Sequence, residues 1–89
     1  MQIHITQIEQ LRYFAEQLEE LRQAMAQQRV DCVARADEIK AKWDDSTYLN
    51  HRRYLDQMLE EVSGFELACD IHSDFLRRKY QAALDVLRG

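Results

Sequence analysis

Two rows of apolar side chains, each repeating every seven residues, constrain the fold of this chain more than any other feature. The first row is Leu11, Leu18, Met25, Cys32 and Ile39, and the second is Tyr48, Leu55, Val62, Cys69, Leu76 and Ala83. A seven-residue repeat places its side chains along one stripe of a helix, and such stripes pack against each other at shallow angles. The pattern predicts two long amphipathic helices.

A break separates the two rows. The only tryptophan, Trp43, is followed by Asp44, Asp45, Ser46 and Thr47, and short polar residues of this kind begin helices and occupy turns. The chain has no proline and two glycines, so little else interrupts a helix. We expect a single helical-hairpin domain over 1–89, with a helix at about 6–43, a turn at about 44–46 and a helix at about 47–88. The predicted fold is all-α, an antiparallel two-helix hairpin of the coiled-coil type.

The ends and middle of these helices carry further signals. Thr6 and Glu9 have the spacing of a capping box at the start of the first helix. Gly64 is expected to be a weak point inside the second helix, and Gly89 suits its C-terminus. A turn near Asp45 places opposite each other residues whose numbers sum to about 90. Cys32 and Cys69 would then be offset along the axis by about 16 Å, too far for a disulfide.

Companion rows lie beside the two apolar rows. In the first helix this row is Ile8, Ala15, Arg22, Arg29, Ala36 and Trp43. In the second helix, Met58, Phe65 and Val86 alternate with His51, His72 and Lys79, and a third, partial row contains Leu59, Tyr80 and Leu87.

Some large apolar residues fall outside a two-helix seam. They are Tyr13, Phe14, Leu21, Phe65, Ile71, Phe75 and Leu84. Soluble monomers seldom expose a continuous surface of this kind, and two hairpins packed face to face as a four-helix bundle would cover it. These residues are therefore the expected interface of a two-fold symmetric homodimer.

Composition and charge bear on the possible function classes. The net charge is −4, and no segment approaches the roughly 20 apolar residues of a membrane span. No positive region precedes an apolar run near Met1, so we expect no cleaved signal peptide and a cytoplasmic location with reduced thiols, and export without a signal peptide stays open. The basic clusters Arg52-Arg53 and Arg77-Arg78-Lys79 have acidic neighbours at helical spacing, which favours ion pairs over nucleic-acid contacts.

Candidates for chemistry are few. Cys69 and His72 lie three residues apart, with Asp70 and Asp74 close by, a spacing that places ligands on one helical face. A zinc site needs four ligands, and the hairpin would keep His4 and His51 far from Cys69. Cys69 also belongs to the apolar row, which indicates a core thiol. We expect no enzyme activity, no metal and no cofactor.

The chain resembles the WXG-type family of small helical-hairpin proteins, which includes the early secreted antigens of bacterial type VII secretion, in its W-x-D variant. The residues that carry this resemblance are Trp43-Asp44-Asp45, Tyr48, Tyr54-Leu55, Phe65, Phe75-Leu76, Lys79 and Leu84, with Leu11, Phe14 and Leu18 in the first helix. Asp45 stands where the family has glycine and is expected to cap the second helix. The family's export signal has an acid four residues after a tyrosine, but after Tyr80 the acid comes one residue late, at Asp85.

The resemblance implies dimers, no catalysis, and recognition by a partner such as a secretion ATPase or a toxin domain. Our main hypothesis is a homodimeric interaction module that engages a larger bacterial partner, with Trp43, Asp44 and Asp45 as the turn and partner-recognition residues. Trp43 has a second interpretation, as a plug for the open end of a bundle. The alternative function is a small secretion or assembly chaperone that holds a client helix on its apolar face.

Overall fold

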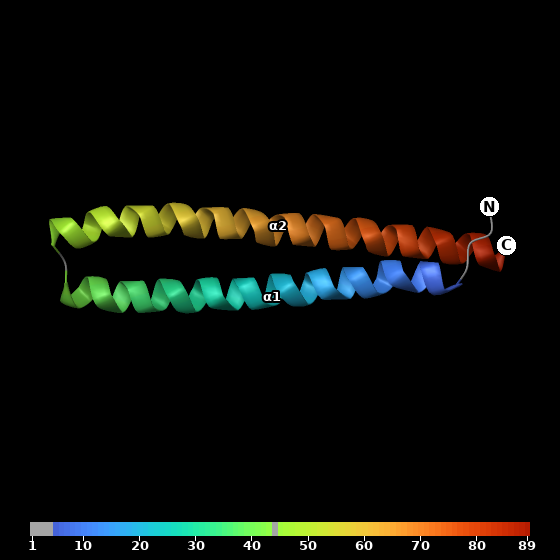
Figure 1. Ribbon diagram of the computed structural model, residues 1–89, viewed down its shortest axis with the longest axis horizontal. Coiled ribbons are helices and arrows are strands. Elements are labelled where there is room, and N and C mark those ends of the chain that lie inside the picture. The colour runs from blue at the N-terminus through green and yellow to red at the C-terminus, as the bar shows by residue number, and fades with distance from the viewer. Residues whose placement is uncertain (1–4, 44) are drawn as a thin grey trace.

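A computed structural model describes residues 5–43 and 45–89 as two antiparallel α-helices, α1 (Ile5–Lys42) and α2 (Ser46–Arg88). The helices lie side by side along their whole length and are joined at one end by a short turn (Figure 1). The hairpin is 66 Å long and 16 by 14 Å across. The prediction of an all-α, antiparallel two-helix hairpin is confirmed, and the helix bounds lie within one residue of those expected from the sequence.

The turn is short because hydrogen bonds close it on both sides. The Trp43 amide donates to the Ile39 carbonyl at 2.8 Å, and the Asp45 amide donates to the Trp43 carbonyl at 2.9 Å. Asp45 has an extended backbone (φ −120°, ψ 169°), and its carboxylate accepts a hydrogen bond from the Tyr48 amide at 2.8 Å. Asp45 is therefore the N-cap of α2, as expected. Asp44, the other acidic residue proposed for the turn, lies outside the described residues.

Replacing Asp45 by alanine removes this cap. The Tyr48 amide then loses its acceptor at the first turn of α2, and we expect the free energy of unfolding to fall by about 1 kcal/mol. Urea denaturation followed by circular dichroism measures the change. Asp45→Asn is the matched control, because asparagine caps helices about as well as aspartate, and equal losses in both variants would contradict the capping role.

The seam between the helices contains small and polar side chains as well as large apolar ones. In α1 it follows the two predicted rows. In α2 it combines the predicted row from Tyr48 to Ala83 with the row of Leu59, Glu66, Ser73 and Tyr80. Among the described residues, the buried apolar side chains are Ile8, Ala15, Ala36, Leu59 and Leu76, and Glu66 and Ser73 are buried with them.

Met58, Phe65 and Val86 lie outside the α2 seam. These side chains are 49%, 65% and 69% exposed. They precede the seam row of Leu59 by one residue, and one residue rotates a side chain by about 100° around a helix. Glu66 and Ser73 lie in the seam row with Leu59 and Tyr80, and because both are polar the apolar pattern showed this row only in part.

The register agrees with a turn near Asp45. Contacts across the seam join Glu9 to Tyr80 and Asp37 to Arg52, pairs whose numbers sum to 89. Both cysteines are free and half-buried. α2 continues through Gly64 without a break. It ends at Gly89, whose positive φ of 74° favours glycine and whose amide donates to the Val86 carbonyl at 3.2 Å.

The predicted capping box at Thr6 is wrong. Thr6 lies inside α1, which is already helical at Ile5. The Glu9 carboxylate accepts hydrogen bonds from Arg12 Nε at 2.6 Å and from the Tyr80 hydroxyl at 3.2 Å. Glu9 therefore joins the two helices at the open end of the hairpin instead of capping one of them.

A candidate protein-binding face

One side of the hairpin carries a continuous group of exposed apolar and aromatic side chains. The Phe14 ring of α1 meets the His72 ring of α2 edge to face, with ring centroids 5.9 Å apart, and Phe75 stacks on His72 at 5.9 Å. This contact joins a row of α1 to a row of α2, each with seven-residue spacing. We call the resulting surface the aromatic face, and its members are Phe14, Leu21, Met58, Phe65, His72 and Phe75.

The aromatic face is large relative to the core of the hairpin. Phe14, Phe65 and Phe75 are 45%, 65% and 49% exposed. With about 200 Å² for an aromatic side chain, these three rings leave roughly 300 Å² in water. The buried apolar residues of the seam include two alanines and no aromatic ring. The fully buried part of the described seam therefore contains no aromatic ring, whereas the aromatic face carries three exposed phenyl rings.

Toward the turn, the same face is hollow. A groove of about 440 Å³ is lined by Met25, Cys32, Met58 and Val62, and an adjoining groove of about 480 Å³ continues from Cys32 past Tyr48. Met58 belongs to the row of Phe65 and His72, so the groove and the rings share one side of the hairpin. The face thus has protruding rings toward its open end and a depression toward the turn.

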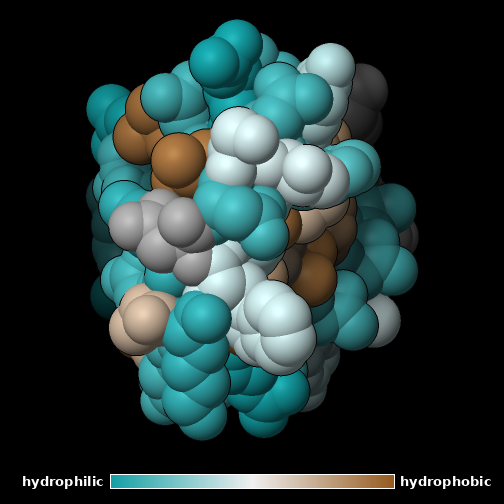
Figure 2. Space-filling model, turned by 90° about the vertical axis from the view of Figure 1, so that its left-hand side faces the viewer, coloured by the Kyte–Doolittle hydropathy of each residue, from teal (hydrophilic) through white to brown (hydrophobic). Residues whose placement is uncertain are grey.

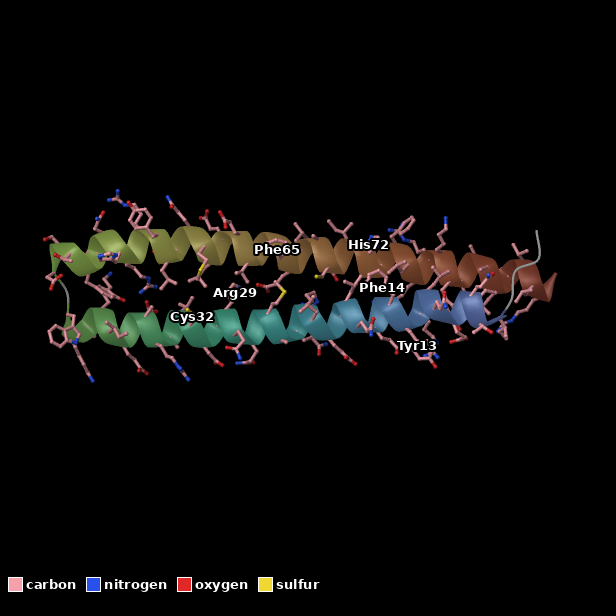
Figure 3. All side chains as sticks on the ribbon, viewed as in Figure 1. Tyr13, Phe14, Arg29, Cys32, Phe65 and His72 are labelled. Atoms are coloured by element: carbon pink, nitrogen blue, oxygen red, sulfur yellow. The ribbon has the colours of Figure 1, made fainter. Side chains whose placement is uncertain are left out.

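The structure brings together four of the seven residues predicted for an interface: Phe14, Leu21, Phe65 and Phe75. Tyr13 projects from the side of α1 away from α2, where the Arg12 guanidinium lies 4.7 Å from its ring centroid (Figure 3). Ile71, by its helical position, lies opposite the seam on α2 and is 60% exposed. Leu84 is half-buried on the other flank, in the row of Asp70 and Arg77. Met58 and His72 were missing from the predicted set, although their seven-residue spacing from Phe65 indicated that they belong to it.

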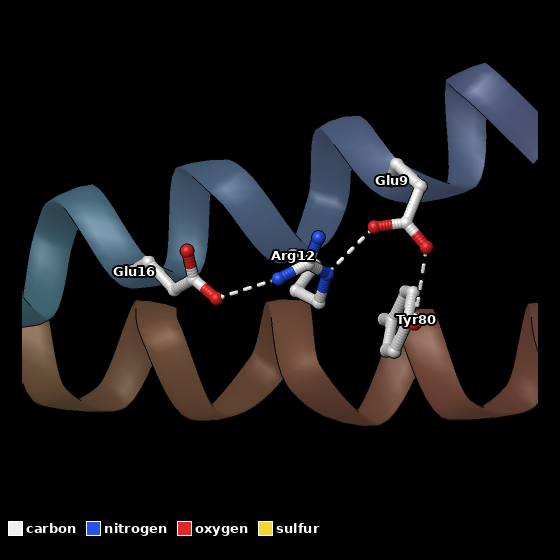
Figure 4. A network of polar contacts seen from close by, with 4 residues as sticks. All are labelled: Glu9, Arg12, Glu16 and Tyr80. Atoms are coloured by element: carbon white, nitrogen blue, oxygen red, sulfur yellow. Dashed lines mark hydrogen bonds and ion pairs between the residues drawn. The ribbon is translucent and has the colours of Figure 1, made fainter.

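The opposite flank of the hairpin is charged. At the open end, Arg12 lies between Glu9 and Glu16, at 2.6 and 2.9 Å, and Glu9 also accepts from Tyr80 (Figure 4). The hydrogen bond from Arg12 to Glu9 raises the pKa of the guanidinium above its ordinary value. Further along, Arg22 pairs with Glu19, and this hydrogen bond lowers the pKa of the Glu19 carboxyl. We call this flank the charged face.

An ion pair crosses the middle of the seam. Arg29 Nε donates to Glu66 at 2.6 Å and Arg29 Nη2 donates at 3.2 Å, and the Glu66 side chain is 11% exposed. The hydrogen bonds from Arg29 lower the pKa of Glu66 below its usual 4.5. A nearly buried carboxylate needs a partner of opposite charge. The pair therefore favours the register in which Arg29 and Glu66 meet.

This ion pair makes the stability of the hairpin dependent on pH. Since the Glu66 pKa is lower in the folded chain, its stabilising contribution is present in full above about pH 4.5 and is lost as the pH falls through the lower, folded-state pKa. We expect Glu66→Gln to flatten the decline of the melting temperature between pH 5 and pH 3 (about the range of carboxyl titration). An unchanged acid decline in thermal melts of this variant would contradict the role of Glu66.

The turn end is mainly hydrophilic. Figure 2 views the molecule from this end and shows polar side chains over most of it, with hydrophobic side chains between them. Trp43 is 66% exposed and Asp45 is also exposed. In a single hairpin the Trp43 side chain is therefore not packed into a hydrophobic core, and its indole is accessible to another molecule.

The candidates for chemistry are separated. Cys69 is half-buried in the seam, whereas His72 is exposed between two phenyl rings. Within residues 5–43 and 45–89, no group of three or more metal-ligating side chains is present; His4 lies outside this part. In the basic clusters, Arg52 and Arg78 form the expected i,i+4 ion pairs with Asp56 and Asp74, and Arg52 also pairs with Asp37 across the seam. Neither of the two described helices has an apolar stretch long enough to cross a lipid bilayer.

Comparisons with models of protein families, with curated proteins and with solved structures find no match to this chain.

Proposed function

We propose that this protein is a non-enzymatic interaction module, a WXG-like helical hairpin that forms a homodimer through its aromatic face and engages a larger bacterial partner. The observation that carries the proposal is the aromatic face itself, where Phe14, Phe65 and Phe75 are 45%, 65% and 49% exposed on a hairpin with a thin core. Leu21 and Met58 extend the roughly 300 Å² left by the three rings, and contiguous exposed apolar patches larger than a few hundred Å² mark protein–protein contacts.

A second hairpin would supply the buried apolar surface that a single hairpin lacks. Two packed helices bury one narrow stripe each, and small domains with so little buried surface are marginal in stability. Packing two aromatic faces together gives a four-helix bundle with a central core that contains the phenyl rings. The charged faces then point outward, where partly exposed ion pairs such as Arg12–Glu9 stay in contact with water.

The turn end is the proposed site for the larger partner. Trp43 and Asp45 are exposed there and do not belong to the aromatic face of a hairpin 66 Å long. An exposed indole surrounded by polar side chains is typical of the anchor residues at protein interfaces. The resemblance to WXG-type proteins favours the same end of the molecule.

Sedimentation equilibrium at micromolar concentration tests the dimer. We expect the mass of two chains. The mass of one chain would contradict the homodimer, and a monomer that gains helix on binding a client would favour the chaperone function instead. Affinity capture from the native host, with Trp43→Ala as the matched control, tests the contact between the turn end and the larger partner. We expect a co-purifying protein that the control loses, while the mass of the control in sedimentation stays that of the dimer.

A further inference from the structure

We infer that the outer side of α2, away from α1, binds a single amphipathic helix of another protein, and that this helix carries basic residues at one end. Residues three or four positions apart share one side of a helix. The surface formed in this way is called the outer face, and its members are Glu60, Glu61, Gly64, Leu67, Ala68 and Ile71. It shares no residue with the aromatic face or with the turn end, so the inference goes beyond the contacts proposed above.

Between positions 64 and 76, α2 carries apolar side chains on nearly every side. Leu76 is buried in the seam and Phe65 belongs to the aromatic face. Ile71 lies opposite the seam and Leu67 lies one turn away from it, and each is 60% exposed. A helix that is apolar all round is ordinarily covered on every side. The outer side of α1 at this level is mainly polar instead, with Gln17, Glu20 and Gln27.

The centre of the outer face is a shallow hollow. It has a volume of about 360 Å³ and is lined by Glu61, Gly64, Phe65 and Ala68. The packing of the hairpin does not require glycine at position 64, because α2 continues through it and a β-carbon built there would meet no atom within 4 Å. Glycine inside a helix is destabilising relative to alanine. The hollow lets the backbone of a second helix approach α2 toward the short end of the usual range of about 8–10 Å.

The end of the outer face nearer the turn is acidic. Glu60 and Glu61 are both exposed there. The ion pairs within residues 5–43 and 45–89 involve neither of them, and no basic residue lies three or four positions away from either along α2. Two carboxylates beside an apolar hollow favour a partner helix that has lysine or arginine at the matching end.

The length of the outer face sets the size of the partner helix. From Glu60 to Ile71 the face extends about 17 Å along α2. A helix of about 18 residues is about 27 Å long and covers this distance with about one turn to spare at each end. Its apolar side chains would recur at the i, i+3, i+4 and i+7 spacing by which a helix lies in an apolar groove.

Binding of a defined peptide tests the inference. The probe is a fluorescently labelled, alanine-based helical peptide of about 18 residues, with a stripe of leucine and alanine and with lysines in its last turn. The matched peptide has glutamines in place of the lysines, because the two residues have similar helix propensity. We expect fluorescence anisotropy to show binding of the lysine peptide, and binding of the glutamine peptide that is about threefold weaker. No binding of the lysine peptide, or equal binding of both, would overturn the inference.

The variant Gly64→Leu tests the hollow. Its side chain enters open space in the hairpin, so we expect the fold to be kept and the melting temperature to rise by about 4 °C, since leucine is a better helix former than glycine. The same side chain fills the hollow, and we expect the affinity for the lysine peptide to fall by about tenfold or more. The matched control is Ala34→Leu, which adds the same bulk at an exposed position on the outer side of α1 and should leave the affinity unchanged.

Sedimentation equilibrium separates this contact from the proposed dimer. Gly64→Leu should keep the mass of two chains. A fall to the mass of one chain would mean that a second copy occupies the outer face, and would overturn the inference. Undiminished peptide binding by Gly64→Leu, or an equal loss in Ala34→Leu, would also overturn it. A parent protein with the mass of one chain that binds the lysine peptide as expected would contradict the dimer and support the outer face.

Discussion

Replacing both Phe14 and Phe75 by serine should convert the protein from a dimer to a monomer. Each ring is about half exposed in the single hairpin and is covered in the proposed bundle, and each substitution occurs twice in a symmetric dimer. With about 1 kcal/mol lost per ring, the total is about 4 kcal/mol, a rise in the dissociation constant of about 1,000-fold. Sedimentation velocity over a range of concentrations measures the change.

The matched control is Tyr13→Ser with Ile71→Ser. These side chains are 56% and 60% exposed, as much as the phenylalanines, but they lie on the far sides of the two helices. We expect this control to keep the mass of two chains. If both double variants dissociate equally, loss of surface apolarity in general would explain the result, and the aromatic face would have no special role.

Enlarging Ser73 should destabilise the hairpin itself. Ser73 and Ala15 are fully buried, and the register places them at about the same level, so small side chains allow the helices to approach closely there. Leucine at position 73 has no space in the seam and should lower the free energy of unfolding by about 1–3 kcal/mol, the usual cost of overpacking. Thermal melts followed by circular dichroism measure the loss.

Ser73→Ala separates side-chain volume from hydrogen bonding. The Ser73 hydroxyl donates to the Asp70 carbonyl of its own helix at 3.0 Å, a local bond that adds nothing across the seam. We expect the alanine variant to stay within about 0.5 kcal/mol of the parent protein. A large loss in this variant, or none in the leucine variant, would show that close approach at this level is unimportant.

The sequence was sufficient to predict the hairpin because both of its main signals are local. The seven-residue rows define the helices, and the polar residues after Trp43 define the turn. The side of α2 that faces α1 was harder to predict, since the α2 seam contains the polar residues Glu66 and Ser73. Each is favourable there only because of the facing helix: Glu66 meets Arg29, and the small Ser73 allows close packing. A pattern read along one helix contains no information about the other.

The same uncertainty about which side of each helix faces the seam affected the choice of residues for the candidate interface. The excess of apolar residues was visible in the sequence, but assigning Tyr13, Ile71 and Leu84 to a face required the position of the seam to within one residue. The capping box failed for a related reason. Thr6 and Glu9 have the right spacing, yet Glu9 bonds to Tyr80, which is 71 residues away in the chain. Long-range partners of this kind outweigh a local motif.

The separation of the charged face from the aromatic face has a consequence for the solution behaviour of the protein. Salt screens exposed charges over a Debye length of about 8 Å at physiological ionic strength. The ion pairs of Arg12 and Arg22 lie on the flank away from the rings, so screening them leaves the contact between two aromatic faces almost untouched. Added sodium chloride should change how these molecules repel one another in concentrated solution, and it should leave the strength of their pairing nearly constant.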